Sequence, residues 1–172
     1  KECSIIFAES YTNLLPEGTL DRLAELIGKP ITLLSREQVE GEKEILGAAS
    51  SFSVALVVPG DPMIATTHVS LILAAKKKGI QTEIIHASSI LSAAIGESGL
   101  QVYKFGKTAS MPKWSQTHKP ASFMNIIKEN QSIKAHTLLL TDIGLDSKTA
   151  LQQLKESSAS QLPNKVLIVS AA

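Results

Sequence analysis

Cysteine is almost absent from this sequence of 172 residues, which contains only Cys3. A single thiol excludes an internal disulfide and a zinc site built from several thiolates, and it agrees with a reducing compartment. No apolar run approaches the roughly 20 residues of a membrane-spanning helix. The N-terminus also lacks the layout of a signal peptide. We therefore predict a cytoplasmic protein that does not bind membranes.

Excess charge of either sign is lacking too. The formal net charge is +1, so no global field attracts polyanions. Lysines 76, 77 and 78 precede Gly79 at the end of a predicted helix, where cations suit the negative end of the helix dipole. We interpret this run as part of a helix end and predict no nucleic-acid partner.

The sequence contains none of the common motifs of hydrolytic, metal or nucleotide chemistry. It has no Gly-x-Ser-x-Gly elbow, no His-x-x-x-His or Cys-x-x-Cys spacing, and neither form of the Gly-rich phosphate loop. An ATPase or an ordinary dinucleotide enzyme is therefore not expected, and we predict no metal. The histidines stand far apart, and each is interpreted as a polar surface or strand-end residue: His68, His86, His118 and His136.

Strand-like and helix-like patterns alternate from the first residues onward, which is typical of an α/β fold in which helices cover a sheet. In the first half the patterns predict strands at 4–8, 31–34, 54–58 and 82–86. Helices are predicted at 18–27, closed by Gly28, and at 36–49, where Gly41 and Gly47 weaken the pattern. A third helix, capped by Thr66 or Thr67, is predicted to run to residue 78.

The second half repeats this alternation. Strands are predicted near 100–105, 137–142 and 165–169, and helices near 121–129 and 147–157, with an irregular stretch through 111–114. The small, Ser-rich segment 88–99 is typical of a short helix and a linker. We therefore predict two α/β domains, residues 1–90 and residues 91–172.

The junction after the predicted strand 54–58 carries the first functional prediction. In open α/β sheets, ligands bind at the carboxyl ends of the strands. Gly60 permits close backbone approach, and Asp61 offers a carboxylate to a ligand hydroxyl or ammonium group. Residues 88–90 follow a further predicted strand and residues 140–142 end another, so three strand ends are expected to converge on one small molecule.

Several segments together resemble the diphthine synthases, in the tetrapyrrole methylase-like group of S-adenosylmethionine-dependent methyltransferases. Their order and spacing are as expected over nearly the whole chain. The resemblance implies a two-domain tetrapyrrole methylase-like fold, with a mainly parallel N-terminal sheet and a mixed sheet in the second domain. The segments are residues 9–12, Pro59-Gly-Asp-Pro-Met-Ile-Ala-Thr-Thr-His68, His86-Ala-Ser-Ser-Ile90, residues 99–108, 110–112 and 138–143.

The resemblance also implies a reaction and a partner. The reaction is methyl transfer from S-adenosyl-L-methionine to the amino nitrogen of a modified histidine on translation elongation factor 2, giving diphthine and S-adenosyl-L-homocysteine. An in-line displacement of this kind depends on alignment and exclusion of water, so no catalytic residue is assigned. Carried over position by position, the cofactor contacts fall on Asp61, Ile64, Ser89, Ile90 and Leu140. A homodimer is expected as well.

The chain departs from the family pattern at both ends, where an N-terminal Gly-rich strand and loop and a C-terminal part are expected but not found. Two alternatives therefore stay open: a methylase of porphyrins or corrins, and a non-catalytic binding module. Two interpretations also stay open for Trp114 with Met111 and Pro112: a surface that meets the elongation factor, or a lid on the local core.

Overall fold

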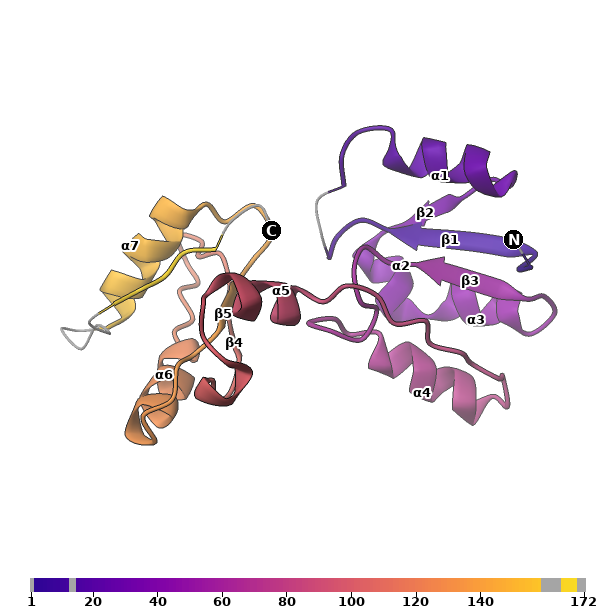
Figure 1. The fold of residues 1–172 in the computed structure, drawn as a ribbon. Coiled ribbons are helices and arrows are strands. Elements are labelled where there is room, and N and C mark those ends of the chain that lie inside the picture. Colours follow the sequence, from indigo (N-terminus) through magenta and orange to yellow (C-terminus); the bar gives the residue numbers. More distant parts are fainter. Residues whose placement is uncertain (1, 13–14, 159–164, 170–172) are drawn as a thin grey trace. The chain divides into compact units, whose positions relative to one another are not determined.

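The structure is a computed structural model that describes residues 2–12, 15–158 and 165–169. The chain divides into two compact units, residues 1–89 and residues 90–172 (Figure 1). The division into domains at residue 90, made from the sequence, stays a prediction.

A three-stranded parallel sheet forms the centre of the first unit. Its strands are β1 (Ile5–Glu9), β2 (Thr32–Leu34) and β3 (Val54–Val57), in the order β2-β1-β3. Four of the five residues of β1 are buried, as expected for a central strand of a parallel sheet covered on both faces. These three strands confirm the predicted strands at 4–8, 31–34 and 54–58.

The helices of the first unit are α1 (Thr19–Ile27), α2 (Arg36–Gly41), α3 (Lys43–Ala49) and α4 (Val69–Lys77). Figure 1 shows α3 and α4 on one side of the sheet and α1 on the other. Residues from the strands and from α2, α3 and α4 form the core: Phe7, Leu34, Val39, Ile45, Leu46, Leu71 and Ala75.

Two helix predictions need correction. Residues 36–49 form two helices, because Glu42 between them adopts a left-handed φ of 62° that interrupts the helical hydrogen bonds. The helix after β3 begins at Val69, and neither Thr66 nor Thr67 caps it by its side chain. The Thr66 hydroxyl instead donates to the Pro62 carbonyl oxygen at 2.8 Å.

The predicted strand at 82–86 does not form. Residues 80–89 have no regular secondary structure, and Ile85 is 79% exposed. The sequence Thr-Glu-Ile-Ile favours an extended backbone, but a strand also needs a neighbouring strand with which to form hydrogen bonds. Among the described residues no strand pairs with this segment, so its extended chain stays outside the sheet.

The second unit contains α5 (Ile90–Glu97), a 3-10 helix η1 (Val102–Lys104), β4 (Ala109–Met111), α6 (Phe123–Ser132), β5 (Leu139–Thr141) and α7 (Ser147–Ser157). The strands β4 and β5 pair in parallel, with Ser110 opposite Leu140. The predictions at 121–129, 137–142 and 147–157 are confirmed. The core consists of Ala109, Met111, Phe123, Met124, Ile127, Leu145 and Leu154.

Other predictions for this unit are wrong. Residues 100–105 contain η1 in place of a strand, and Tyr103 is 89% exposed, so the alternating pattern has no surface to bury against. The strand β4 lies partly in the stretch predicted to be irregular, because Met111 is buried in the core. Residues 165–169 form no strand, so the described part of this unit has a purely parallel sheet and not the predicted mixed one.

None of the helices in the described ranges has the length and apolar character that crossing a membrane would require.

Candidate functional site

The loop after β3 is shaped by Asp61. Gly60 adopts a φ of 89°, and the Met63 amide donates to Asp61 Oδ1 at 2.9 Å. The Ile64 amide donates to the Asp61 carbonyl oxygen at 3.3 Å. An aspartate that accepts from the backbone two residues later is typical of a turn. The predicted carboxylate is therefore present at the carboxyl end of β3, but part of its capacity is used by its own loop.

A second set of donors reaches Asp61 from the segment that follows α4. His86 Nδ1 lies 2.9 Å from Asp61 Oδ2, and the Ala87 amide donates to the same oxygen at 3.4 Å. The side chain of Asp61 is 7% exposed, whereas that of His86 is 69% exposed. We call this arrangement of Asp61, His86 and the amides of Met63 and Ala87 the Asp61 clamp.

The clamp favours the ionised form of the carboxylate. The Met63 amide is the largest cause that holds the pKa of Asp61 below its ordinary value; burial opposes this shift, and His86 and the Ala87 amide add to it. An ionised carboxylate has no proton to give, so Nδ1 of His86 carries the hydrogen. The pair therefore fixes the orientation of the imidazole ring.

The same two segments also meet backbone to backbone. A Cβ atom added at Gly60 would lie 3.4 Å from the Ser88 carbonyl oxygen. That distance is close van der Waals contact, and the positive φ of Gly60 disfavours any other residue. The glycine predicted to permit close approach to a ligand is thus explained by the approach of residue 88.

A buried histidine connects the β3 loop to the loop after β1. His68 is 4% exposed; its Nδ1 lies 2.8 Å from the Pro62 carbonyl oxygen, and its Nε2 lies 3.5 Å from the Tyr11 hydroxyl. A carbonyl oxygen only accepts, so Nδ1 donates and Nε2 is left to accept from Tyr11. Interpreting His68 as a surface or strand-end residue was therefore wrong.

Tyr11 keeps its proton in this network. The pKa of Tyr11 is raised to about 12, mainly by burial and in smaller part by the carboxylates of Glu9 and Glu40. The Arg36 guanidinium stacks 5.4 Å from the centre of the ring and opposes the shift. The phenol therefore acts as a hydrogen-bond donor to His68 and not as a base.

Glu9 is fully buried at the end of β1, and sequence analysis did not single out its side chain. Its carboxylate accepts from the Tyr11 amide at 2.9 Å, from the Thr12 amide at 3.1 Å and from the Thr12 hydroxyl. A buried carboxylate needs such partners. A glutamate that ends an apolar strand and precedes Tyr and Thr is the only sequence signal that could have indicated it.

The predicted cofactor residues fall in both units. Asp61 and Ile64 share the loop after β3, and Ser89 follows the segment that the Asp61 clamp holds. Ile90 begins α5 and is 45% exposed, and Leu140 is the central residue of β5. The structure thus brings residues 60 and 61 to residues 86–88, and the role of all five residues stays a prediction.

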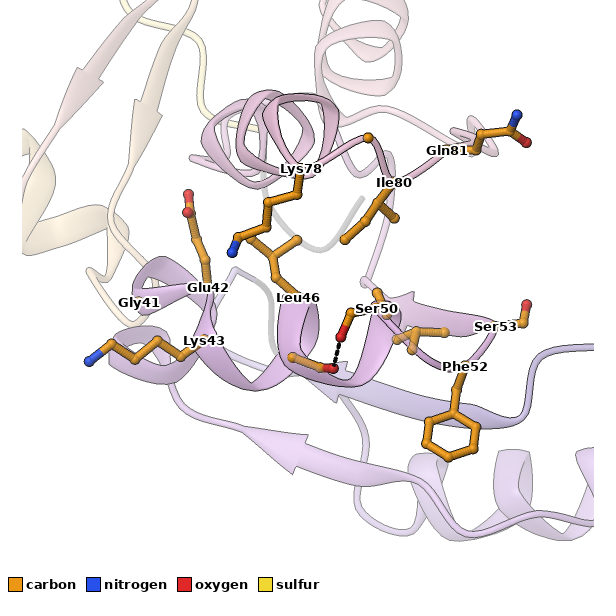
Figure 2. Close-up of a pocket in the computed structure, with 14 residues that line it drawn as sticks. Gly41, Glu42, Lys43, Leu46, Ser50, Phe52, Ser53, Lys78, Ile80 and Gln81 are labelled. Carbon is orange, nitrogen blue, oxygen red and sulfur yellow. Dashed lines mark hydrogen bonds between the residues drawn. The ribbon is translucent and has the colours of Figure 1, made fainter.

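A hollow of the first unit lies elsewhere. It has a volume of about 810 Å³ and is lined by parts of α3, by the start of β3 and by residues 78–81 after α4. Figure 2 shows Leu46 and Ile80 directed into it, while Lys43, Phe52 and Gln81 point away. No predicted cofactor residue lines this hollow. It also borders the amino end of β3, so we assign it no ligand.

The described residues offer no candidate metal site. Within the described residues, no group of three His, Cys, Asp or Glu side chains could hold a metal ion.

Trp114 is attached to its own unit. Its indole Nε1 donates to the Pro120 carbonyl oxygen at 2.9 Å, and its amide donates to Gln153 Oε1 of α7 at 3.1 Å. Gln153 in turn donates to the Pro112 carbonyl oxygen at 3.0 Å. Met111 is 1% exposed in the core. These contacts favour the interpretation of Trp114 as a lid on the local core.

Comparison with known proteins supplies the family. The model of the tetrapyrrole (corrin/porphyrin) methylases matches residues 1–172. The chain belongs to this family. A solved diphthine synthase superposes on 92% of the chain with a TM-score of 0.81 and 38% identity. A putative diphthine synthase from Entamoeba histolytica gives a TM-score of 0.76 at 35% identity over 91% of the chain. The predicted α/β fold is thereby confirmed.

Curated proteins similar to this chain also carry diphthine synthase names. The diphthine synthase of Methanococcus aeolicus is 37% identical over the whole chain, which covers 72% of that protein. The diphthine methyl ester synthase of Eremothecium gossypii is 43% identical over 83% of the chain and 48% of its own length. The predicted resemblance to diphthine synthases is confirmed. The chain spans about half to three quarters of the length of these relatives, and about 60% of the solved structures.

Proposed function

We propose that this chain is part of an S-adenosylmethionine-dependent methyltransferase of the diphthine synthase type, and that the carboxyl end of β3 binds the cofactor. The observation that carries the proposal is similarity over the whole chain to a protein named diphthine synthase, at 37% identity. The position of the Asp61 clamp supports it, because ligands of open α/β sheets bind at this edge.

The residues at this edge fit the cofactor. A carboxylate offers about four acceptor positions, and three donors from the protein occupy positions on Asp61. One position on Oδ1 is left for a ribose hydroxyl or the ammonium group. Ile64 would supply an apolar contact, and Ser89 would supply backbone groups. The family resemblance assigns Ile90 and Leu140, which belong to the second unit, to the cofactor as well. These assignments rest on the family resemblance and on the geometry of the Asp61 clamp.

The proposed reaction requires little of the chain beyond alignment of the two reactants. S-adenosyl-L-methionine supplies a methyl group on a sulfonium, and its carbon–sulfur electron pair stays with sulfur in S-adenosyl-L-homocysteine. The substrate amine would form the new carbon–nitrogen bond with its lone pair and, where the nitrogen carries a hydrogen, would lose a proton to water. The site therefore needs to orient the two reactants and exclude water, which supplies much of the rate increase. No side chain is assigned as a base.

The proposed substrate is the modified histidine of translation elongation factor 2. The names of the relatives, which refer to diphthine and its methyl ester, support it. We also propose that the protein is cytoplasmic and forms a homodimer, and that it needs no nucleic acid, membrane or metal.

The test is transfer of a labelled methyl group from S-adenosylmethionine to elongation factor 2 isolated before this modification. We expect label on the factor and none on a control factor whose target histidine is replaced by alanine. A porphyrinoid substrate is tested in parallel, because the family includes tetrapyrrole methylases. Label on the porphyrinoid alone would replace the proposed substrate. No label on either would favour a non-catalytic binding module.

A further inference from the structure

We infer that His86 is a positioning residue of the cofactor site, which acts through Asp61. The inference rests on the proposed function, since it states how one loop of that site is held. The clamp joins two segments that are 25 residues apart in the chain: the loop after β3 and the segment after α4. His86 supplies the side-chain donor of this junction, and the other donors are backbone amides.

The hydrogen bonds to Asp61 show that its carboxylate mainly joins two segments of the chain and is only partly free to bind a ligand. Oδ1 accepts from the Met63 amide of its own loop, and Oδ2 accepts from His86 and Ala87 of the other segment. The side chain is only 7% exposed. Each oxygen therefore holds one segment, and the carboxylate fixes their separation.

The segment that His86 holds is not ordered by a helix or by pairing with a strand. Residues 80–89 form no regular structure, so their position depends on individual contacts. The Ser88 carbonyl lies against Gly60, and Ser89 follows directly. A change at His86 is therefore transmitted to residues 87–89, one of which is a predicted cofactor residue.

His86 contributes little to the core, because its side chain is 69% exposed. Its loss is thus expected to change the site without unfolding the unit. This separates a positioning role from a merely structural one. The predicted signature is loss of cofactor affinity in a unit that stays folded and loses little thermal stability.

The experiment is calorimetric titration of the full chain with S-adenosyl-L-homocysteine. We expect His86→Ala to weaken binding about tenfold, the effect of one hydrogen bond to a charged group. His86→Asn keeps an N–H donor close to the position of Nδ1 and is expected to stay within about threefold of wild type. His118→Asn, in an exposed turn of the second unit, is the matched control and is expected to change nothing.

A double variant tests whether His86 acts through Asp61. If it does, Asp61→Ala with His86→Ala binds no more weakly than Asp61→Ala alone. Additive losses would show that His86 contacts the ligand itself and would overturn the inference. Equal weakening by His86→Ala and His86→Asn would also overturn it, because the donor would then be irrelevant.

A measurement without cofactor separates this inference from the proposed function. Nitrogen NMR distinguishes the two neutral tautomers of histidine, and the clamp requires the hydrogen of His86 on Nδ1. Asp61→Ala should remove that preference. If wild-type His86 carries its hydrogen on Nε2, the clamp is wrong whether or not the ligand binds. If the Nδ1 tautomer is found but S-adenosyl-L-homocysteine does not bind, the proposed function fails and the clamp stands as structure alone.

Discussion

An aspartate follows a strand in each unit, and the two have different surroundings. Asp61, in the loop after β3, is nearly buried and accepts from two amides and an imidazole. Asp142, directly after β5, is exposed and accepts from the Lys113 amide at 2.9 Å. The short pattern of a strand followed by aspartate is therefore not enough to indicate a site. The difference comes from a histidine 25 residues away, which only the fold brings to Asp61.

The largest effect is expected in the second unit, at a neutral side chain. Asn130 is 2% exposed; its Oδ1 accepts from the Lys107 amide, and its Nδ2 donates to the Lys107 carbonyl and the Thr137 hydroxyl. Asn130→Ala leaves these groups unpaired and should lower the free energy of unfolding by about 3 kcal/mol. Urea unfolding followed by the fluorescence of Trp114, the single tryptophan, reports on this unit.

Asp142→Ala is the comparison variant for Asn130. Because its side chain is exposed, we expect its unfolding midpoint to stay close to wild type. If Asp142→Ala destabilised the unit as much as Asn130→Ala, the strand-end aspartate would be as important here as in the first unit, and the contrast with Asp61 would be lost.

The next effect concerns the approach of the two segments in the first unit. Gly60→Ala places a side chain at positive φ and 3.4 Å from the Ser88 carbonyl. We expect a loss of about 1 to 2 kcal/mol of stability, measured by urea unfolding followed by circular dichroism. Gly47→Ala is the control, since its Cβ would meet nothing within 4 Å and it lies inside α3. An unchanged midpoint for Gly60→Ala would show that the approach is loose.

The sequence predicted the parts of the fold that local pattern determines. The apolar runs of β1 and β3 and the helix at 147–157 were predicted correctly, because burial and helical hydrogen bonds act within a few residues. The segment 82–86 was misread because its residues favour an extended backbone but pairing depends on a distant neighbour. The 3-10 helix η1 was missed for the same reason.

The site was only partly predictable. The loop at Asp61 could be located because Gly, Asp and Pro after an apolar strand mark a turn at a sheet edge. The partner of Asp61 could not be identified, because His86 and the other histidines look alike in sequence. His68 was missed because its contacts combine Pro62 of its own loop with Tyr11 of the loop after β1, which only the fold brings close. Glu9 was missed although its partners, Tyr11 and Thr12, follow it within three residues.

A smaller effect should appear in the pH dependence of stability. The folded-state pKa of Asp61 is lowered, so its contribution is present above the ordinary value of about 3.9 and is lost as the pH falls through the folded value. We expect the difference in urea midpoint between wild type and Asp61→Asn to be constant above about pH 5 and to shrink below about pH 4. A difference that grew toward acid pH would mean that the clamp favours the protonated carboxyl group.

The most direct test of the central claim is calorimetric titration of the wild-type chain, Asp61→Ala and Asp142→Ala with S-adenosyl-L-homocysteine. Our account predicts binding by wild type, affinity within about twofold of it for the exposed Asp142 variant, and a loss of about tenfold or more for the Asp61 variant. Equal affinity of all three, or no binding by a folded wild-type chain, would contradict the claim that the carboxyl end of β3 in this chain binds the cofactor.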